Sequence, residues 1–199
     1  MIEKIAYRQG FGDLLAEGAT LAARKIGNDS EKYVMAVKGL DLGMHDPRGA
    51  KWMRKQAAVG PSGGDHCGSA HKSQSLKNTL GMCLMLSYDD DRMLELLNAA
   101  TGWDMSEDEL ADVYERGITM ARIFNLREGI NPVEISIPGR ILGDPAQTEG
   151  NMRGITIDID MQTEKFCEVM GWDGATAVPS RERLESLGGL EPVIETIYG

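Results

Sequence analysis

The stretch "SEDELADVYERGITMARIFNLR" (106–127) carries the clearest structural signal in the chain. Ser106 and Glu109 have the S-x-x-E spacing of a capping box, in which each side chain accepts a hydrogen bond from the backbone N–H of the other residue. Small and apolar residues then recur at helical spacing, which predicts one buried face over about five turns. These residues are Leu110, Val113, Gly117, Met120, Ala121 and Phe124.

Shorter patterns on either side of this stretch also indicate helices. The predicted helices cover 10–27, 50–59, 76–87, 90–102, 161–172 and 180–188. A β-like run covers 32–40, and the proline-bearing segment 129–160 has little periodicity. We therefore expect a mainly α chain with few short strands. Its expected organisation is a helical region over 1–128 and an extended segment with closing helices over 129–199, or one continuous domain.

The composition narrows the class of protein. The chain has 199 residues and a formal net charge of −10, from 21 basic and 31 acidic residues. This charge disfavours binding to nucleic acid and to anionic membranes, because phosphate groups are repelled. No apolar run approaches the ~18 residues of a spanning helix, and three cysteines do not form a disulfide framework. We expect a cytoplasmic protein without a signal peptide.

The glycine-rich segment "GPSGGDHCGSAH" (60–71) gathers possible metal ligands. His66, Cys67 and His71, together with Cys83, are residue types that bind zinc. Zinc is disfavoured because adjacent side chains such as His66 and Cys67 rarely bind one tetrahedral ion, and no C-x₂-C pair is present. A cysteine–histidine nucleophile pair is a second possibility, for which the sequence supplies no orienting group. Glycines here would let a cofactor or substrate approach the backbone closely.

The segment "NTLGMC" (78–83) allows two interpretations. The first is a buried helix over 76–87 with an ordinary core cysteine, since free cysteine is among the most buried residue types. The second is a site residue. The chain has too few cysteines for a four-thiolate iron–sulfur cluster, but Cys83 could contribute one ligand to a cluster whose other ligands lie on a different polypeptide.

Two further segments contain an arginine close to a glycine. They are "HDPRGAKW" (45–52), with Arg48, and "FNLREGINP" (124–132), with Arg127. Each could hold an anionic group. A charged loop that closes on solvent is the favoured interpretation of both segments.

Several segments, taken in order, resemble one family. They are "IEKIAYRQGFGDLLAEG" (2–18), "VKGLDLGMHDPRGA" (37–50), "GPSGGDH" (60–66), "NTLGMC" (78–83), "LNAATGWDMSEDEL" (97–110), "ARIFNLREG" (121–129) and "GWDGATAVPSRERLESLG" (171–188). This succession is similar to the C-terminal half of the aldehyde:ferredoxin oxidoreductase family. Its members are tungsten or molybdenum enzymes with a bis-pyranopterin cofactor and a [4Fe–4S] cluster. The resemblance implies the helical C-terminal domains of such an enzyme.

The resemblance also implies roles for individual residues. Cys83 matches the cysteine of the family's D-x-x-G-L-C motif and would be the fourth cluster ligand. Asn78, Gly81 and Met82 match the pterin-contacting part of that motif, although Asn78 replaces an aspartate and loses its charge. His66 matches a histidine near the metal and would be the catalytic acid/base. Beside these residues, we expect Cys67 to be incidental.

The activity implied by the resemblance is oxidation of an aldehyde to a carboxylate, with electrons passed through the cluster to ferredoxin. The family's C-x₂-C-x₃-C cluster motif and first pterin motif would precede Met1, so the expected partners are ferredoxin and an N-terminal part or subunit. We expect no tungsten, molybdenum or cluster in the isolated chain, which could form a homo-oligomer. Alternatives are the aromatic acyl-CoA reductase branch of the family and a cofactor-free helical interaction module.

Overall fold

The structure of the protein is a computed structural model that describes residues 1–43, 45–65, 68, 70–131 and 137–199. Its described part is mainly helical with two short strands, which confirms the expected fold class. The elements are α1 (Ile2–Ala6), α2 (Phe11–Leu15), α3 (Ala19–Ile26), η1 (Ser30–Tyr33), β1 (Ala36–Val37), β2 (Leu40–Asp41), α4 (Met53–Val59), α5 (Lys72–Thr79), α6 (Asp90–Thr101), α7 (Glu107–Arg127), α8 (Gly139–Leu142), α9 (Ile159–Met170), α10 (Arg181–Leu187) and α11 (Glu191–Tyr198).

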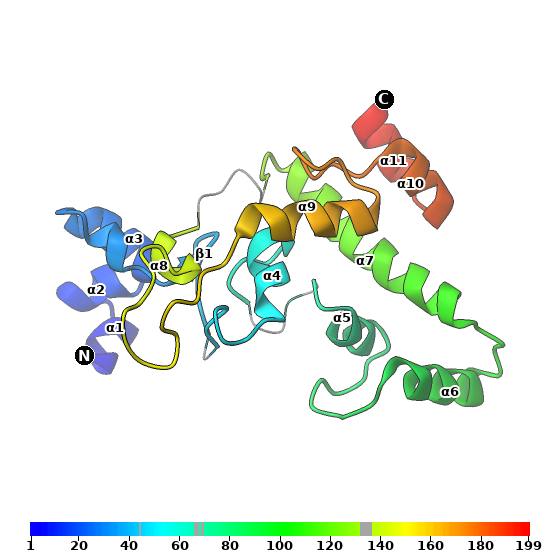
Figure 1. Cartoon of the computed structure of the whole chain (residues 1–199), viewed down its shortest axis with the longest axis horizontal. Helices are drawn as coiled ribbons and strands as arrows, with labels where there is room; N and C mark the ends of the chain where they lie inside the picture. Colours follow the sequence, from blue (N-terminus) through cyan, green and yellow to red (C-terminus); the bar gives the residue numbers. More distant parts are fainter. Residues whose placement is uncertain (44, 66–67, 69, 132–136) are drawn as a thin grey trace.

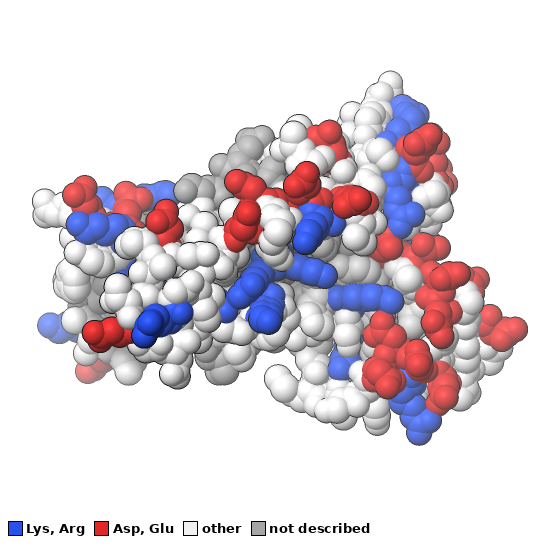
Figure 2. All heavy atoms as spheres, viewed as in Figure 1, with Lys and Arg blue, Asp and Glu red and all other residues white. Residues whose placement is uncertain are grey.

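The elements form an elongated molecule, in which the longest helix, α7, runs from the middle toward the end opposite the N-terminus (Figure 1). Helices α1–α3, the antiparallel β1–β2 hairpin and α8 occupy the N-terminal end, and α4 packs against α9 in the middle. From there α7 extends to the far end, with α5 and α6 on one side of it and α10 and α11 on the other. Lys and Arg atoms run across the middle of the molecule, whereas Asp and Glu dominate the end that contains α6 (Figure 2). On the face shown, the middle of this acidic chain therefore carries a basic band.

Helix α7 has the predicted N-terminus but a different buried face. The capping box is present, because the Ser106 N–H donates to Glu109 Oε2 at 2.8 Å and the Glu109 N–H donates to Ser106 Oγ at 3.3 Å. Met120 and Phe124, predicted to be buried, are 50% and 56% exposed. The buried residues are Leu110, Tyr114, Ile118, Thr119, Arg122 and Ile123. The predicted face was wrong because polar side chains take part in the packing: Thr119 and Arg122 are buried on this helix, and the spacing of small and apolar residues does not indicate them.

The main core lies between α4, α5, α6, α7 and α9. It draws on both the region before residue 128 and the region after it. Its buried members are Ala58, Val59, Ala70, Leu76, Met93, Leu110, Tyr114, Ile118, Phe166, Cys167, Met170, Trp172 and Ala177. A second cluster places Ile123 of α7 against Leu184, Leu187 and Leu190, so the C-terminal helices also pack on α7.

Two other predicted helices differ from the structure. The helix expected over 10–27 is divided into α2 and α3 by Gly18, whose φ of 86° is incompatible with a continuing helix. The buried helix expected over 76–87 was wrong, because α5 ends at Thr79 and Met85 is 82% exposed. Gly81, with a φ of 69°, ends the helix there. Glycine is favoured in this left-handed region because a side chain would clash with the backbone.

Candidate functional site

The end of α5 presents the residues of the "NTLGMC" segment to the surface. The Leu80 N–H donates to the Leu76 carbonyl at 2.9 Å and the Met82 N–H donates to the Lys77 carbonyl at 2.8 Å, which closes the last turn. This pattern of bonds around a left-handed glycine redirects the chain, so Cys83 lies beyond the helix rather than on it.

The side chains in this segment are accessible. Asn78, Gly81 and Cys83 are exposed, Cys83 is a free thiol, and Met82 is half-buried against the main core. No atom lies within 4 Å of the position that a Cβ of Gly81 would take. The structure therefore brings three of the four predicted residues to one open surface and leaves Met82 partly packed beneath it. The interpretation of Cys83 as an ordinary core cysteine is wrong.

Described residues of the glycine-rich segment that precedes α5 surround the side chain of Gln56. The buried Gln56 amide nitrogen donates to Ser62 Oγ at 3.1 Å and the Gly63 carbonyl at 3.3 Å, and its oxygen accepts from the Ala70 N–H at 3.1 Å. A Cβ on Gly60 or Gly68 would lie 2.3 or 2.1 Å from the Gln56 amide carbon. These two glycines therefore allow close packing on Gln56, rather than the cofactor approach that the sequence suggested for them.

Gly63 and Gly64 of the same segment pack against the β1–β2 hairpin. A Cβ on Gly63 would lie 2.6 Å from the Val37 carbonyl oxygen, and one on Gly64 would lie 2.5 Å from the Leu40 carbonyl oxygen. Both glycines are buried. Nothing in the sequence pointed to Gln56 as the residue that organises this segment, because a single glutamine before two alanines has no distinctive spacing. The predicted acid/base His66 and its neighbour Cys67 lie outside the described residues.

His71, at the start of α5, belongs to a cluster of three aromatic rings that contact one another edge to face. Trp52 lies between His45 and His71, with ring centroids 5.3 and 6.1 Å away in edge-to-face arrangements. The His71 Nδ1 atom is buried and has no hydrogen-bond partner in the described part of the chain. Burial lowers the pKa of His71, the positive charges of Lys55 and Lys77 lower it further, and Asp90 opposes this effect. The imidazole is therefore neutral at neutral pH.

A Lys55→Met substitution tests this electrostatic assignment. We expect the pKa of His71 to rise, because a positive charge that disfavours the imidazolium ion is removed. The pH titration of the His71 Cε1–H signal in a proton NMR spectrum measures the change. Lys51→Met, which removes an exposed lysine that does not act on His71, is the control. An unchanged His71 pKa in Lys55→Met would contradict the assignment.

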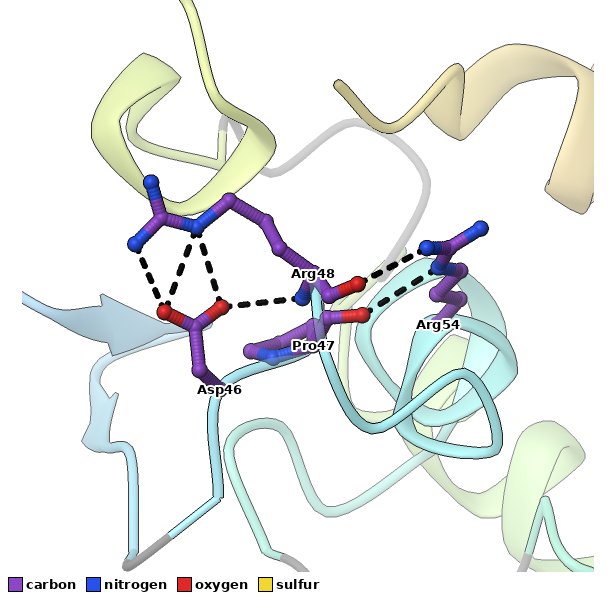
Figure 3. Close-up of polar contacts among 4 residues, drawn as sticks. All are labelled: Asp46, Pro47, Arg48 and Arg54. Carbon is purple, nitrogen blue, oxygen red and sulfur yellow. Dashed lines mark hydrogen bonds and ion pairs between the residues drawn. The ribbon is translucent and has the colours of Figure 1, made fainter. Parts of the chain in front are cut away.

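The four-residue cluster around Asp46 fixes the loop that follows β2 (Figure 3). Asp46 accepts hydrogen bonds from the Arg48 backbone N–H at 2.9 Å, from Nε at 3.0 Å and from Nη2 at 2.6 Å. Arg54 donates to the carbonyls of Pro47 and Arg48 at 3.2 and 2.9 Å. The hydrogen bonds from Arg48 lower the pKa of Asp46, and Asp46 raises that of Arg48.

Both arginines singled out in the sequence have acidic partners. Arg48 is 6% exposed and forms its ion pair with Asp46, so the loop is more buried than the favoured interpretation supposed. Arg127 pairs with exposed Glu128 at 3.0 Å on the surface. The structure therefore gives no support to an anion site at either arginine, since their charges are already balanced.

The described residues contain neither a metal-binding cluster nor a membrane-spanning helix. No group of three His, Cys, Asp or Glu side chains in this part of the chain could hold a metal ion, and the possible zinc ligands His66 and Cys67 lie outside it. None of the helices described is both long enough and apolar enough to cross a membrane.

Known proteins match nearly the whole length of the chain. Residues 1–188 match the family model for aldehyde ferredoxin oxidoreductase, domains 2 and 3. The tungsten-containing aldehyde ferredoxin oxidoreductases of Pyrococcus furiosus and Thermococcus kodakarensis are 32% and 31% identical to it, over 94% of this chain and 36% of their own length. The WOR-like subunit of aliphatic sulfonate oxidoreductase from Pyrococcus furiosus is 27% identical, over 94% of this chain and 34% of its own length. The chain thus spans about a third of the length of the curated relatives it matches. Because the family model covers nearly the whole chain, the chain belongs to the aldehyde ferredoxin oxidoreductase family, with residues 1–188 corresponding to domains 2 and 3.

Proposed function

We propose that this chain contributes one side of the cofactor site of a tungsten or molybdenum pterin oxidoreductase, which oxidises aldehydes to carboxylates. Family membership and the tungsten-containing relatives support the proposal. The observation that carries it is the position of Cys83, an exposed free thiol directly after the turn that ends α5. The turn that carries Cys83 lies at the surface of this chain, so the rest of the cofactor environment would come from another part of the protein or another subunit.

The residues around this turn fit a group that approaches from outside the chain. An accessible thiol can be deprotonated and bind iron, so Cys83 would complete a [4Fe–4S] cluster whose other ligands lie elsewhere. The Asn78 amide can both donate and accept hydrogen bonds at the edge of a pterin. The open backbone of Gly81 allows close approach, and the half-buried Met82 anchors the turn on the core.

When bound, the metal pterin would supply the two-electron oxidation of the aldehyde, with water as the source of the added oxygen, and the cluster would supply one-electron transfer to ferredoxin. The task of this chain is then to position these groups and to manage protons. By its place in the sequence, His66 would exchange a proton with the oxygen of the substrate. Cys167 has no part in the site, because it is fully buried in the main core and burial raises the pKa of its thiol.

A chimeric enzyme tests the proposal. Residues 1–199 would replace the matching C-terminal part of the Pyrococcus furiosus relative. The tungsten and iron contents of the chimera would be measured, and its activity would be followed as the aldehyde-dependent reduction of a viologen dye. We expect both metals and aldehyde oxidation in the chimera, and loss of cluster iron and dye reduction in Cys83→Ser. Cys167→Ala is the matched control and should keep the cluster.

Two outcomes would refute the proposal. One is a full complement of cluster iron in Cys83→Ser. The other is a chimera that is folded by circular dichroism but binds neither metal. Aliphatic sulfonates are assayed beside aldehydes because the 27% identical relative is an aliphatic sulfonate oxidoreductase subunit. Faster turnover with a sulfonate than with an aldehyde would support the proposed cofactor site but refute aldehydes as the substrate class.

A further inference from the structure

A hollow of about 400 Å³ opens between α7 and α9, and residues of α4 and the start of α5 border one end of it. Its volume lies within the range of small-molecule sites, which is about 300–1,000 Å³. Lys72 at the start of α5 borders the hollow, whereas Asn78 lies near the other end of the helix, about 9 Å further along the axis at 1.5 Å per residue. The hollow is therefore separate from the proposed cofactor-facing end of α5.

The wall of the hollow is largely apolar. Phe166 and Met170 of α9 are buried in the main core and also line the hollow, and Tyr114 of α7 lies opposite them. The Tyr114 hydroxyl donates to the Ala70 carbonyl at 3.4 Å, and burial raises its pKa to about 12, so it stays neutral. At the rim, Val169 is 75% exposed. Covering such surface with an apolar group is favourable by roughly 25 cal/mol per Å².

The charges around the hollow are mostly positive. Lys55 of α4, Lys72 of α5 and Lys165 of α9 line it, so three separate helices each contribute one lysine. Lys72 also pairs with Asp90, at 3.1 Å. Neither Lys55 nor Lys165 forms a salt bridge with an acidic residue in the described parts of the chain. This gathering of lysines occurs in a chain whose formal net charge is −10.

Two further features favour an anion at the end of the hollow that is bordered by Lys72 and the start of α5. Among the described residues, Glu115 is the one acidic residue that lines the hollow, and its carboxylate is paired with Arg183. The positive end of the α5 dipole also points this way, and its N-cap residue His71 makes no side-chain hydrogen bond to the first turn. An anionic group placed here would therefore meet the positive charges of Lys55 and Lys165, which form no salt bridge in the described parts of the chain.

We propose that this hollow binds a monocarboxylate with an apolar body. The carboxylate lies among Lys55, Lys72 and Lys165, and the body packs on Phe166 and Met170. A neutral apolar molecule would leave the lysines unused, and a highly charged anion such as a nucleotide would leave the apolar wall uncovered. The inference rests on the hollow alone and not on the proposed function, so the two can fail independently.

The test uses the 199-residue chain with phenylacetate as ligand and phenylacetamide as its uncharged analogue, with binding followed by NMR. We expect phenylacetate to bind at least about tenfold more tightly than the amide, a difference of about 1.4 kcal/mol. Binding should weaken as salt is added, because the exposed lysines are screened. Equal binding of acid and amide, or no binding of phenylacetate at millimolar concentration, would overturn the proposal.

Charge substitutions at the rim locate the site. Val169 is exposed, so Val169→Glu and Val169→Lys should both leave the fold intact, which circular dichroism checks. Val169→Glu should weaken phenylacetate binding severalfold, whereas Val169→Lys should preserve or strengthen it. Lys165→Met should weaken it as well, and Lys32→Met, which alters an exposed lysine in η1 away from the hollow, should not. Identical binding in the two Val169 variants would place phenylacetate elsewhere and overturn the assignment.

Discussion

Replacing Gly63 with alanine is expected to lower the free energy of unfolding by about 3 kcal/mol. Gly63 has a φ of 68°, where an alanine is strained, and its new Cβ would lie 2.6 Å from the carbonyl oxygen of the fully buried Val37. The glycine-rich segment would have to move away from the β1–β2 hairpin. Urea denaturation followed by circular dichroism measures the change.

Two other glycine substitutions separate the effect of backbone strain from the effect of the close contact with Val37. Gly81→Ala introduces the same backbone strain at a φ of 69° but meets no atom within 4 Å, so we expect a smaller loss of about 1 kcal/mol. Gly174→Ala meets no atom either and has no positive φ, so its effect should stay within about 0.5 kcal/mol. If Gly63→Ala were no more destabilising than Gly81→Ala, the close packing on Val37 would not contribute to stability.

The second large effect is expected at Arg122. This side chain is 1% exposed, and it donates to the Ala177 and Thr176 carbonyls at 2.9 Å and to Asn131 Oδ1 at 2.6 Å. Arg122→Met should lower the free energy of unfolding by about 3 kcal/mol, because the buried Ala177 carbonyl loses its partner and the charged hydrogen bonds are lost. The same denaturation experiment measures it.

Arg127→Met is the matched control on the same helix. Arg127 is exposed and pairs with Glu128 on the surface, so its removal should cost less than about 1 kcal/mol. Arg122→Lys should recover little of the lost stability, because an ammonium group cannot reproduce the planar set of donors that reaches the three acceptors. Equal stability of the Arg122→Met and Arg127→Met variants would contradict the role given to Arg122.

Local signals in the sequence predicted the helix starts and stops better than the buried faces. The Ser106–Glu109 capping box lies where it was expected, and Gly102 ends α6 in the left-handed conformation. These features depend on a few neighbouring residues, so the sequence alone contains them. The buried face of α7 depends instead on what packs against it. Arg122 is buried only because the distant segment around Ala177 supplies carbonyl acceptors.

The same distinction applies to the candidate site. The family resemblance indicated Asn78, Gly81, Met82 and Cys83, but periodicity favoured a buried helix over them. Leucine and methionine at 80–86 are equally typical of a core helix, and only the left-handed turn at Gly81 places Cys83 on the surface. Their roles toward a cofactor remain predictions, as does that of His66.

The sequence by itself determined that the chain is mainly helical, where its long helix begins, and which family it resembles. Each of these follows from residues that are adjacent or ordered along the chain. The tertiary structure decided the rest. It showed that Gly68 packs on Gln56, that Arg122 donates to the Ala177 carbonyl, and that lysines from three helices line one hollow. These contacts join residues whose spacing along the chain follows no pattern, because folding selects them by shape and charge.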